Sequence, residues 1–128
     1  MSITDLVIRL KNGYMSRKER ITSPYSKYRI SVLEKLKALN YIEKFEIEGE
    51  GEIIKTIVVD LKYEGGVPAI TDVKIFSKPG RRWYVPYKEI RPVLGGMGKV
   101  ILSSSKGILT DKEAKKERVG GELLFHIW

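Results

Sequence analysis

Three consecutive serines, a lysine and a glycine are the residues whose types and spacing best suit specific chemistry: Ser103, Ser104, Ser105, Lys106 and Gly107. Short hydroxyl groups donate and accept hydrogen bonds at close range, where longer side chains would not fit. The lysine adds attraction for an anionic ligand. An apolar run, Val100-Ile101-Leu102, precedes the serines and predicts a strand that would hold them rigidly. The group is therefore suited to reading a polar, negatively charged surface.

A second candidate group is a basic turn, made of Lys78, Pro79, Gly80, Arg81 and Arg82. Its Pro-Gly pair fits the central positions of a type II turn, so the cations would cluster at the turn. Tyr84 stands just beyond, where a ring could stack on an unpaired base. Strand alternation allows only one of Trp83 and Tyr84 to face inward. Together with hydroxyls that can contact base edges, 2′-hydroxyl groups and phosphates, these features suit RNA.

Catalytic and metal chemistry find little support in the sequence. There is no cysteine and one histidine, His126, which excludes disulfides, thiol catalysis and zinc ribbons; we expect His126 to be a packed or edge-strand residue. The glycine-rich GGMGK, residues 95–99, departs from the phosphate-loop motif, and it leads into a strand instead of joining two helices as a KH loop does. An RNA-cleaving enzyme would need converging acids, whereas those in residues 43–52 alternate along a predicted strand. The sequence predicts no enzyme, no cofactor, no metal and no small-molecule substrate.

The charge is divided unevenly along the chain. The net charge is +8 in 128 residues: residues 1–40 hold nine Lys/Arg and three Asp/Glu, residues 41–64 hold three and seven, and residues 66–128 hold twelve and six. Two basic surfaces with an acidic segment between them favour a polyanionic partner, although general solubility is an alternative. A membrane-surface adaptor is a further alternative, but the basic helix expected at residues 111–118 is short for it, and no run of 18 apolar residues is present. We expect no membrane association and no signal peptide.

The N-terminal half predicts two helices and a hairpin. Ile3, Leu6, Val7 and Leu10 share a helical face, with a capping box at Ser2 and Asp5 and a stop at Gly13. A loop over residues 14–25 precedes a second helix. Ser26 would cap the start of this helix and Asn40 would end it. Its buried face would be formed by Val32, Leu33, Leu36 and Leu39. Period-two alternation then predicts strands on either side of a turn at residues 49–51.

The C-terminal half predicts mainly strands. The predicted strands cover residues 70–76, 83–85, 100–102 and 122–128. A short helix is expected at residues 87–94. A second one, at residues 111–118, would begin with a capping box of Thr110 and Glu113 and end at Gly120-Gly121. The composition of residues 65–68 is that of a linker. We therefore predict an α+β protein with an N-terminal helix and hairpin domain (residues 1–64) and a C-terminal, mainly antiparallel β domain with short helices (residues 69–128).

Several of these segments resemble one known family. SKPGRRWY, GGMGKVILSSSKGILTDKEA and VGGELLFHIW, with DLVIRLKNGY near the N-terminus, are similar to bacterial small-subunit ribosomal protein S8 over essentially the whole chain. The family signature is Ser-Thr-Ser-Lys-Gly, two apolar residues, Thr-Asp, a basic helix and Gly-Gly-Glu. Ser104 stands where most members have threonine, so the hydroxyl is kept and a methyl contact is lost.

The resemblance implies a non-catalytic, cytoplasmic protein of the 30S subunit that binds the central domain of 16S rRNA and helps to order the platform. It implies RNA contacts from the serine loop and Tyr84, a bracing role for Glu122, and backbone contacts from Thr4, Lys27 and Tyr28. It implies ribosomal proteins S5 and S12 as neighbours. Some family members also repress translation of their own operon through a messenger mimic of the rRNA site, which is a second expectation.

Overall fold

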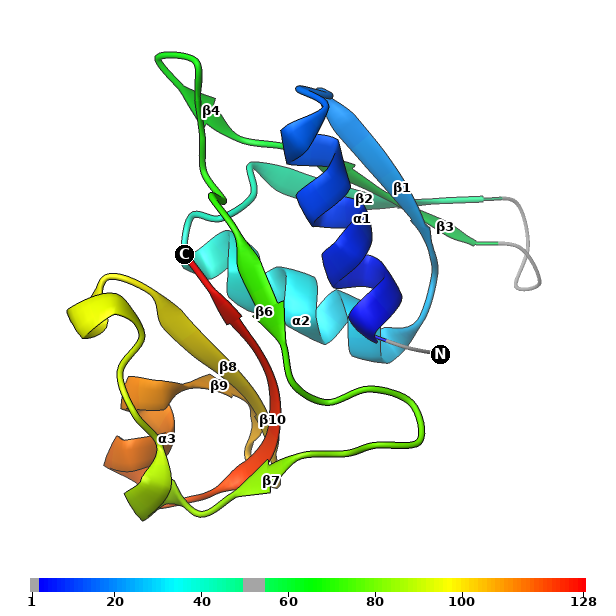
Figure 1. Ribbon diagram of the computed structural model, residues 1–128. Coiled ribbons are helices and arrows are strands. Elements are labelled where there is room, and N and C mark those ends of the chain that lie inside the picture. The colour runs from blue at the N-terminus through cyan, green and yellow to red at the C-terminus, as the bar shows by residue number, and fades with distance from the viewer. Residues whose placement is uncertain (1–2, 50–54) are drawn as a thin grey trace. The chain divides into compact units, whose positions relative to one another are not determined.

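The chain folds into two compact units, Ile3–Thr71 and Asp72–Trp128, in a computed structural model that describes residues 3–49 and 55–128 (Figure 1). Every strand pair in the described residues is antiparallel, and helices accompany the sheets of both units. The predicted α+β class is confirmed. Within the described ranges, no helix has the length and apolar character needed to cross a membrane.

The first helix, α1 (Ile3–Met15), buries the predicted face of Ile3, Leu6, Val7 and Leu10. The predicted stop at Gly13 is wrong, because the helix continues through it. A Cβ atom at this position would lie 2.5 Å from Cγ2 of Ile21, so the glycine allows the helix to approach the neighbouring strand. The predicted capping residue Ser2 lies outside the described residues.

The second helix, α2 (Lys27–Ala38), begins as predicted: the Ser26 hydroxyl accepts a hydrogen bond from the backbone N–H of Arg29 at 3.1 Å. Val32, Leu33 and Leu36 are fully buried, as predicted. The prediction for Leu39 is wrong, because Leu39 caps the end of the helix and is half-buried. After the helix, Asn40 takes the predicted left-handed conformation, with a φ of 65°.

The two helices accompany a three-stranded sheet of order β1-β3-β2, made of β1 (Arg20–Pro24), β3 (Thr56–Asp60) and β2 (Lys44–Glu48). The predicted hairpin is β2 and β3, and residues 50 and 51 of its predicted turn lie outside the described residues. The expectation of a loop over residues 14–25 is wrong at its start, because α1 includes Tyr14 and Met15, and at its end, because β1 pairs with β3 from Arg20 to Pro24. A proline is tolerated there because β1 is an edge strand and Pro24 is its last residue.

Arg29 is buried beneath α1 and β1, with only 2% of its surface exposed. Its guanidinium donates hydrogen bonds to the Ser23 hydroxyl and, at 3.1 Å, to the Asp5 carboxylate, which also accepts from Arg9 at 2.8 Å. The bond from α2 to Asp5 joins the first turns of the two helices. Partial burial raises the pKa of Asp5, but hydrogen bonds and charge from Arg9 and Arg29 outweigh it and hold that pKa below its ordinary 3.8.

We expect Asp5→Asn to lower the free energy of unfolding by about 1 kcal/mol at neutral pH, because it leaves the buried Arg29 without its carboxylate. A carboxyl with a depressed pKa stabilises the folded state above its ordinary pKa, and that contribution is lost as the pH falls through the lower folded value. Urea unfolding should therefore show the difference from wild type shrinking as the pH is lowered below about 4. Glu34→Gln removes an exposed carboxyl of α2 and is the control. A difference that stays constant with pH would contradict this assignment.

The predicted linker coincides with a small hairpin in the first unit. Its strands are β4 (Tyr63–Glu64) and β5 (Val67–Pro68), and Gly65 and Gly66, both with positive φ, form its turn. The Arg17 guanidinium donates to the carbonyl of Gly66, and the Tyr63 hydroxyl donates to the carbonyl of Lys18 at 2.7 Å. The boundary between the two units falls at Thr71 and Asp72. The division into domains of residues 1–64 and 69–128 stays a prediction.

The second unit has a five-stranded sheet around a central last strand, β10 (Gly121–Ile127). On one side β10 pairs with β6 (Val73–Ile75) and β7 (Tyr84–Val85); on the other it pairs with β8 (Lys99–Ser104), which pairs with β9 (Gly107–Thr110). Figure 1 shows β10 running between these neighbours. The strand after the serines, β9, is an element that sequence analysis missed.

One face of this sheet supports the core of the second unit, formed by Ile90, Val93, Val100, Leu102, Ala114 and Leu123. Helix α3 (Asp111–Glu117) begins with the predicted capping box of Thr110 and Glu113. It ends one residue early, because Arg118 takes a left-handed conformation and stops it before the glycines. The predicted helix over residues 87–94 is wrong: only a 3₁₀ turn, η1 (Tyr87–Glu89), forms before Pro92, and a second, η2 (Leu94–Gly96), follows.

Candidate nucleic-acid interface

The central strand β10 aligns predicted site residues that are far apart in the sequence. Glu122 lies directly opposite Tyr84 on β7 and directly opposite Ser103 on β8. Residues opposite one another in adjacent strands project from the same face of a sheet. Tyr84, Glu122 and Ser103 therefore form one row across three strands. The tyrosine is 69% exposed, so its ring is available to a partner.

The predicted serine loop is the tip of the β8–β9 hairpin. Ser104 pairs with Gly107, whose φ of 104° suits glycine, and Ser105 and Lys106 form the exposed turn. The Ser104 hydroxyl accepts from the backbone N–H of Lys106 at 3.1 Å and donates to the carbonyl of Gly107 at 2.9 Å. The Ser104 hydroxyl thus gives its one proton to the turn, and Ser103 and Ser105 are the candidates that can donate to a partner.

The cation of this turn is held by a carboxylate that sequence analysis did not single out. The Lys106 Nζ lies 2.9 Å from Oε2 of Glu117, at the end of α3. About half of each side chain is exposed, 53% and 46% respectively. The hydrogen bond and charge of Lys106 lower the pKa of Glu117, so this carboxylate is ionised at neutral pH.

Gly120 and Gly121 set the spacing of the strands around the row. A Cβ atom on Gly121 would lie 2.3 Å from the carbonyl oxygen of Ser103, and one on Gly120 would lie 2.3 Å from that of Val85. The glycines that we predicted to stop α3 instead allow β10 to approach both neighbouring strands. A larger residue at position 121 must therefore move the backbone that carries Ser103.

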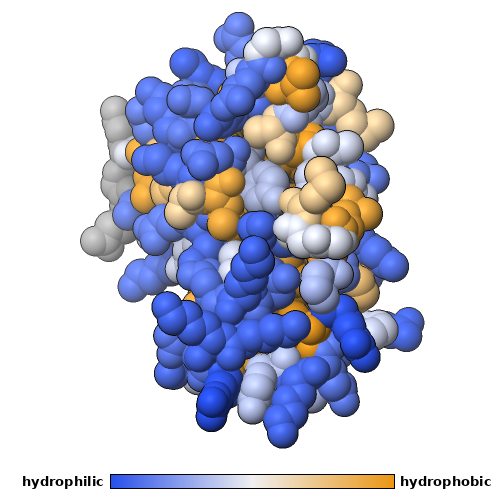
Figure 2. Space-filling model, turned by 90° about the vertical axis from the view of Figure 1, so that its left-hand side faces the viewer, coloured by the Kyte–Doolittle hydropathy of each residue, from blue (hydrophilic) through white to orange (hydrophobic). Residues whose placement is uncertain are grey.

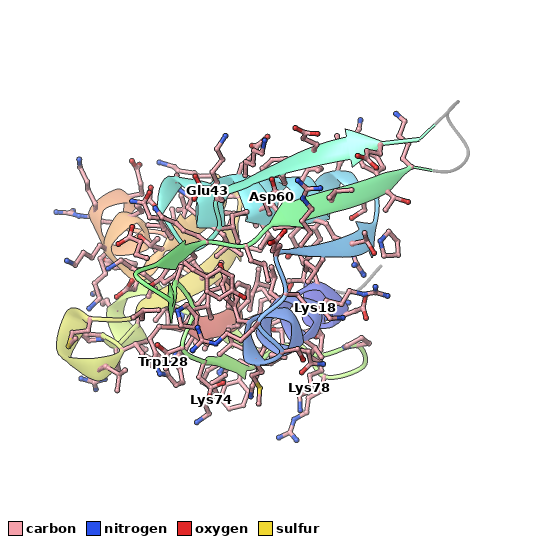
Figure 3. The ribbon with its side chains drawn as sticks, turned by 90° about the horizontal axis from the view of Figure 1, so that it is seen from above. Lys18, Glu43, Asp60, Lys74, Lys78 and Trp128 are labelled. Atoms are coloured by element: carbon pink, nitrogen blue, oxygen red, sulfur yellow. The ribbon has the colours of Figure 1, made fainter. Side chains whose placement is uncertain are left out.

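The basic turn forms as predicted. Lys78 and Arg81 exchange two backbone hydrogen bonds, of 3.0 and 2.9 Å, and Gly80 has the positive φ, 79°, that a type II turn requires. Buried Ser77 accepts the N–H of Trp83 at 2.9 Å and so closes the base of the turn. Figure 3 shows the side chains of Lys74 and Lys78 projecting outward from this region.

The cations of the basic turn differ in their surroundings. The Arg82 guanidinium lies 3.2 Å from the carboxylate of Glu122, whose side chain is 15% exposed. Lys78 and Arg81 are exposed at the turn itself. This pair connects the basic turn to the row of Tyr84, Glu122 and Ser103. The structure thus brings the turn and the serine hairpin together around Glu122.

Trp83 lies just before β7 and is 44% exposed, so neither Trp83 nor Tyr84 is buried. Trp83 packs edge-on against Phe76, with 5.6 Å between the ring centroids. The centroids of the Phe76 and His126 rings are 4.4 Å apart. Burial, with the charge of Lys74, lowers the pKa of His126, which is therefore neutral at physiological pH. The expectation of a packed strand histidine is confirmed.

Three further predicted contacts lie in the first unit. Thr4 lies in the first turn of α1 and is half-buried. Lys27 and Tyr28 are the first two residues of α2; Lys27 is exposed and Tyr28 is half-buried. The bond between Arg29 and Asp5 holds these two helix starts together. The structure thus groups the three residues at one end of the helix pair.

No group of three or more His, Asp or Glu side chains that could hold a metal ion occurs in residues 3–49 and 55–128. Figure 2 shows a mainly hydrophilic face, on which hydrophobic residues form small, separate groups. The predicted site residues can therefore supply hydrogen bonds, positive charge and the exposed ring of Tyr84.

Comparison with known proteins identifies relatives over nearly the whole chain. The family model described as "Ribosomal protein S8" matches residues 2–128. The small ribosomal subunit protein uS8 of Dictyoglomus thermophilum is 51% identical over 126 residues, which is 98% of this chain and 95% of that protein. The proteins of the same name from Mycoplasmopsis pulmonis and Mycoplasmopsis synoviae are 45% and 41% identical over 98% of this chain and 95% and 96% of their own lengths.

Proposed function

The chain belongs to the ribosomal protein S8 family, and we propose that it binds the central domain of 16S rRNA as a primary binder and helps to assemble the platform of the 30S subunit. As a member of this family it is a structural protein of the small ribosomal subunit, located in the ribosome, which is cytoplasmic in bacteria. The RNA contacts would come from Ser103, Ser105, Lys106, Gly107 and Tyr84, with Ser104 shaping the turn and Glu122 bracing it.

The observation that carries this proposal is the row that β10 builds. An exposed ring and a serine-tipped hairpin stand on one face, spaced by a single residue on the strand between them. Irregular RNA offers unstacked bases for the ring, and 2′-hydroxyl groups and base edges for the serines. A regular RNA duplex also displays phosphates and 2′-hydroxyl groups, but its bases are stacked and cannot reach the ring. Recognition would therefore rest on shape and hydrogen bonding, with charge as a general attraction.

The test is a comparison of binding to a 16S central-domain fragment and to an unrelated RNA duplex of equal length, titrated over salt. We expect the central-domain fragment to bind at least about 1,000-fold more tightly, with a similar salt slope. Equal affinities would leave only the charge argument and refute specific recognition. Cleavage of the bound RNA on addition of a divalent metal would instead support an RNA-processing enzyme.

Lys78 and Arg81 would contact the RNA backbone, together with Pro79, Gly80 and Arg82 of the same turn. Replacing Lys78 and Arg81 with glutamine should weaken binding to all RNA and make the salt slope shallower by about 1.5 to 2 units, because two phosphate contacts are lost. Titration of both RNAs over salt measures this. The control variant is Lys35→Gln with Lys37→Gln on α2, which makes the same charge change in the first unit. An unaltered slope would show that Lys78 and Arg81 face solvent in the complex.

From the first unit, Thr4, Lys27 and Tyr28 would contact the RNA backbone at the paired helix starts. The protein neighbours expected in the assembled subunit are S5 and S12. A second role, repression of its own operon through a messenger that mimics the rRNA site, would use the same residues. Competition between the rRNA fragment and the leader of that messenger would test it.

A further inference from the structure

Glu117 places a negative charge at the end of a helix where negative charge is unfavourable. It is the last residue of α3, and the C-terminus of a helix carries partial negative charge that favours cations. Its neighbours in the sequence, Lys115, Lys116 and Arg118, are basic. The side chain reaches instead to Lys106, with 2.9 Å between Nζ and Oε2. One acid at the basic end of the helix thus neutralises the one cation of the serine turn.

This ion pair changes what the serine turn presents. Without this ion pair, the Lys106 ammonium group on the exposed turn would attract any phosphate. Such attraction does not depend on the sequence or the shape of the RNA. With it, the ammonium is directed toward α3, while the hydroxyls of Ser103 and Ser105 stay available. A phosphate must compete with the Glu117 carboxylate for Lys106, whether or not the RNA fits the rest of the site.

We propose that Glu117 is a specificity-determining residue, which lowers the affinity of the serine turn for non-cognate RNA by holding Lys106. This inference rests on the proposed RNA-binding function. In the cognate complex, hydroxyl contacts and stacking would provide most of the affinity, and the contact of Lys106 with the RNA would add little to it. In a non-cognate complex, charge provides most of the affinity, and the loss of one available cation has a larger effect. Glu117 would therefore raise the ratio of cognate to non-cognate binding.

The experiment is a Glu117→Gln substitution in the full chain, with binding to the central-domain fragment and to the unrelated duplex measured over salt. We expect the duplex to bind about 2- to 5-fold more tightly, with a salt slope steeper by about 0.7 to 0.9, because one further phosphate is neutralised. Binding to the central-domain fragment should change less than about 2-fold. The matched control is Glu46→Gln, which removes an exposed acid lying 3.8 Å from Lys44 in the first unit.

A second variant tests whether the effect passes through Lys106. In a Lys106→Gln background, Glu117→Gln should no longer alter binding to the duplex, because there is no cation to release. Equal effects of Glu117→Gln and Glu46→Gln would reduce the result to net charge and overturn the proposal, as would an effect that persists without Lys106. Both comparisons measure binding to the duplex. They therefore test the role of Glu117 even if the wild type shows no preference for the central-domain fragment, a result that would refute the proposed function.

Discussion

Replacing Ser103 and Ser105 together with alanine is expected to weaken binding to the 16S central-domain fragment by about 2 to 4 kcal/mol, without a change in the salt slope. The two hydroxyls stand at the end of β8 and at the hairpin tip, where the structure leaves them accessible. Their loss would leave polar groups of the RNA without partners in a contact that excludes water. Since neither residue is charged, the number of neutralised phosphates should stay the same.

The measurement is the dissociation constant of the double variant at several salt concentrations, with Ser16→Ala as a control. Ser16 is an exposed serine that follows α1 in the first unit, so its loss should leave the affinity unchanged. Ser104→Ala is informative in a different way, because its hydroxyl makes two hydrogen bonds inside the turn. That variant should loosen the hairpin, seen as faster amide exchange at Lys106. Unchanged affinity of the double variant would remove the two hydroxyls from the interface.

The second large effect is expected from Gly121→Ala. The added methyl group would lie 2.3 Å from the Ser103 carbonyl oxygen, so β8 and β10 must separate. Overpacking costs about 1 to 3 kcal/mol, and a contact this short against backbone should fall near the upper end. Ser103 would move with its strand, so we also expect affinity for the central-domain fragment to fall at least about 10-fold, equivalent to about 1.4 kcal/mol.

Amide hydrogen exchange in β8 and β10 reports the stability of the second unit alone and is the appropriate measurement. Gly65→Ala is a useful comparison, because an added Cβ there meets nothing within 4 Å, although its φ of 56° carries a strain of about 1 to 2 kcal/mol. That variant should lose stability in the first unit and keep its RNA affinity. Native exchange rates and full affinity for Gly121→Ala would mean that the strands do not need this close approach.

Features fixed by local interactions were predictable from the sequence. The caps at Ser26 and Thr110 join a side chain to a backbone group three residues away, and the Pro79-Gly80 turn depends on the φ preferences of its own two residues. The buried face of α2 follows from helical periodicity. In each case the physical cause lies within a few residues of its effect.

Features fixed by distant partners were not predictable. The strand β1 has a single buried apolar side chain, Ile21, and its pairing with β3 joins residues far apart in sequence. Arg29 sits on the buried face of α2, where hydrophobicity alone predicts no cation, because Asp5 and Ser23 supply its partners from other elements. The helix predicted over residues 87–94 fails for a local reason instead, because Pro92 within it removes a backbone donor.

The candidate site divides in the same way. The serines, the basic turn and Tyr84 were identified from residue type, but nothing local indicated that one residue, Glu122, would lie between Tyr84 and Ser103. The pairing of Lys106 with Glu117 was also missed. A lysine and a glutamate eleven positions apart carry no periodic signal, and only the return of the chain through β9 and α3 brings them together.

The position of β10 has a consequence for the order of events during synthesis. This strand joins β6, β7 and β8 into one sheet, yet it follows all of them in the chain. A nascent chain can therefore complete the helices and sheet of the first unit while the row of Tyr84, Glu122 and Ser103 is still open. The ability to recognise RNA would appear abruptly, when residues 121–127 become free to insert, so that unfinished chains would not occupy the RNA in place of finished ones.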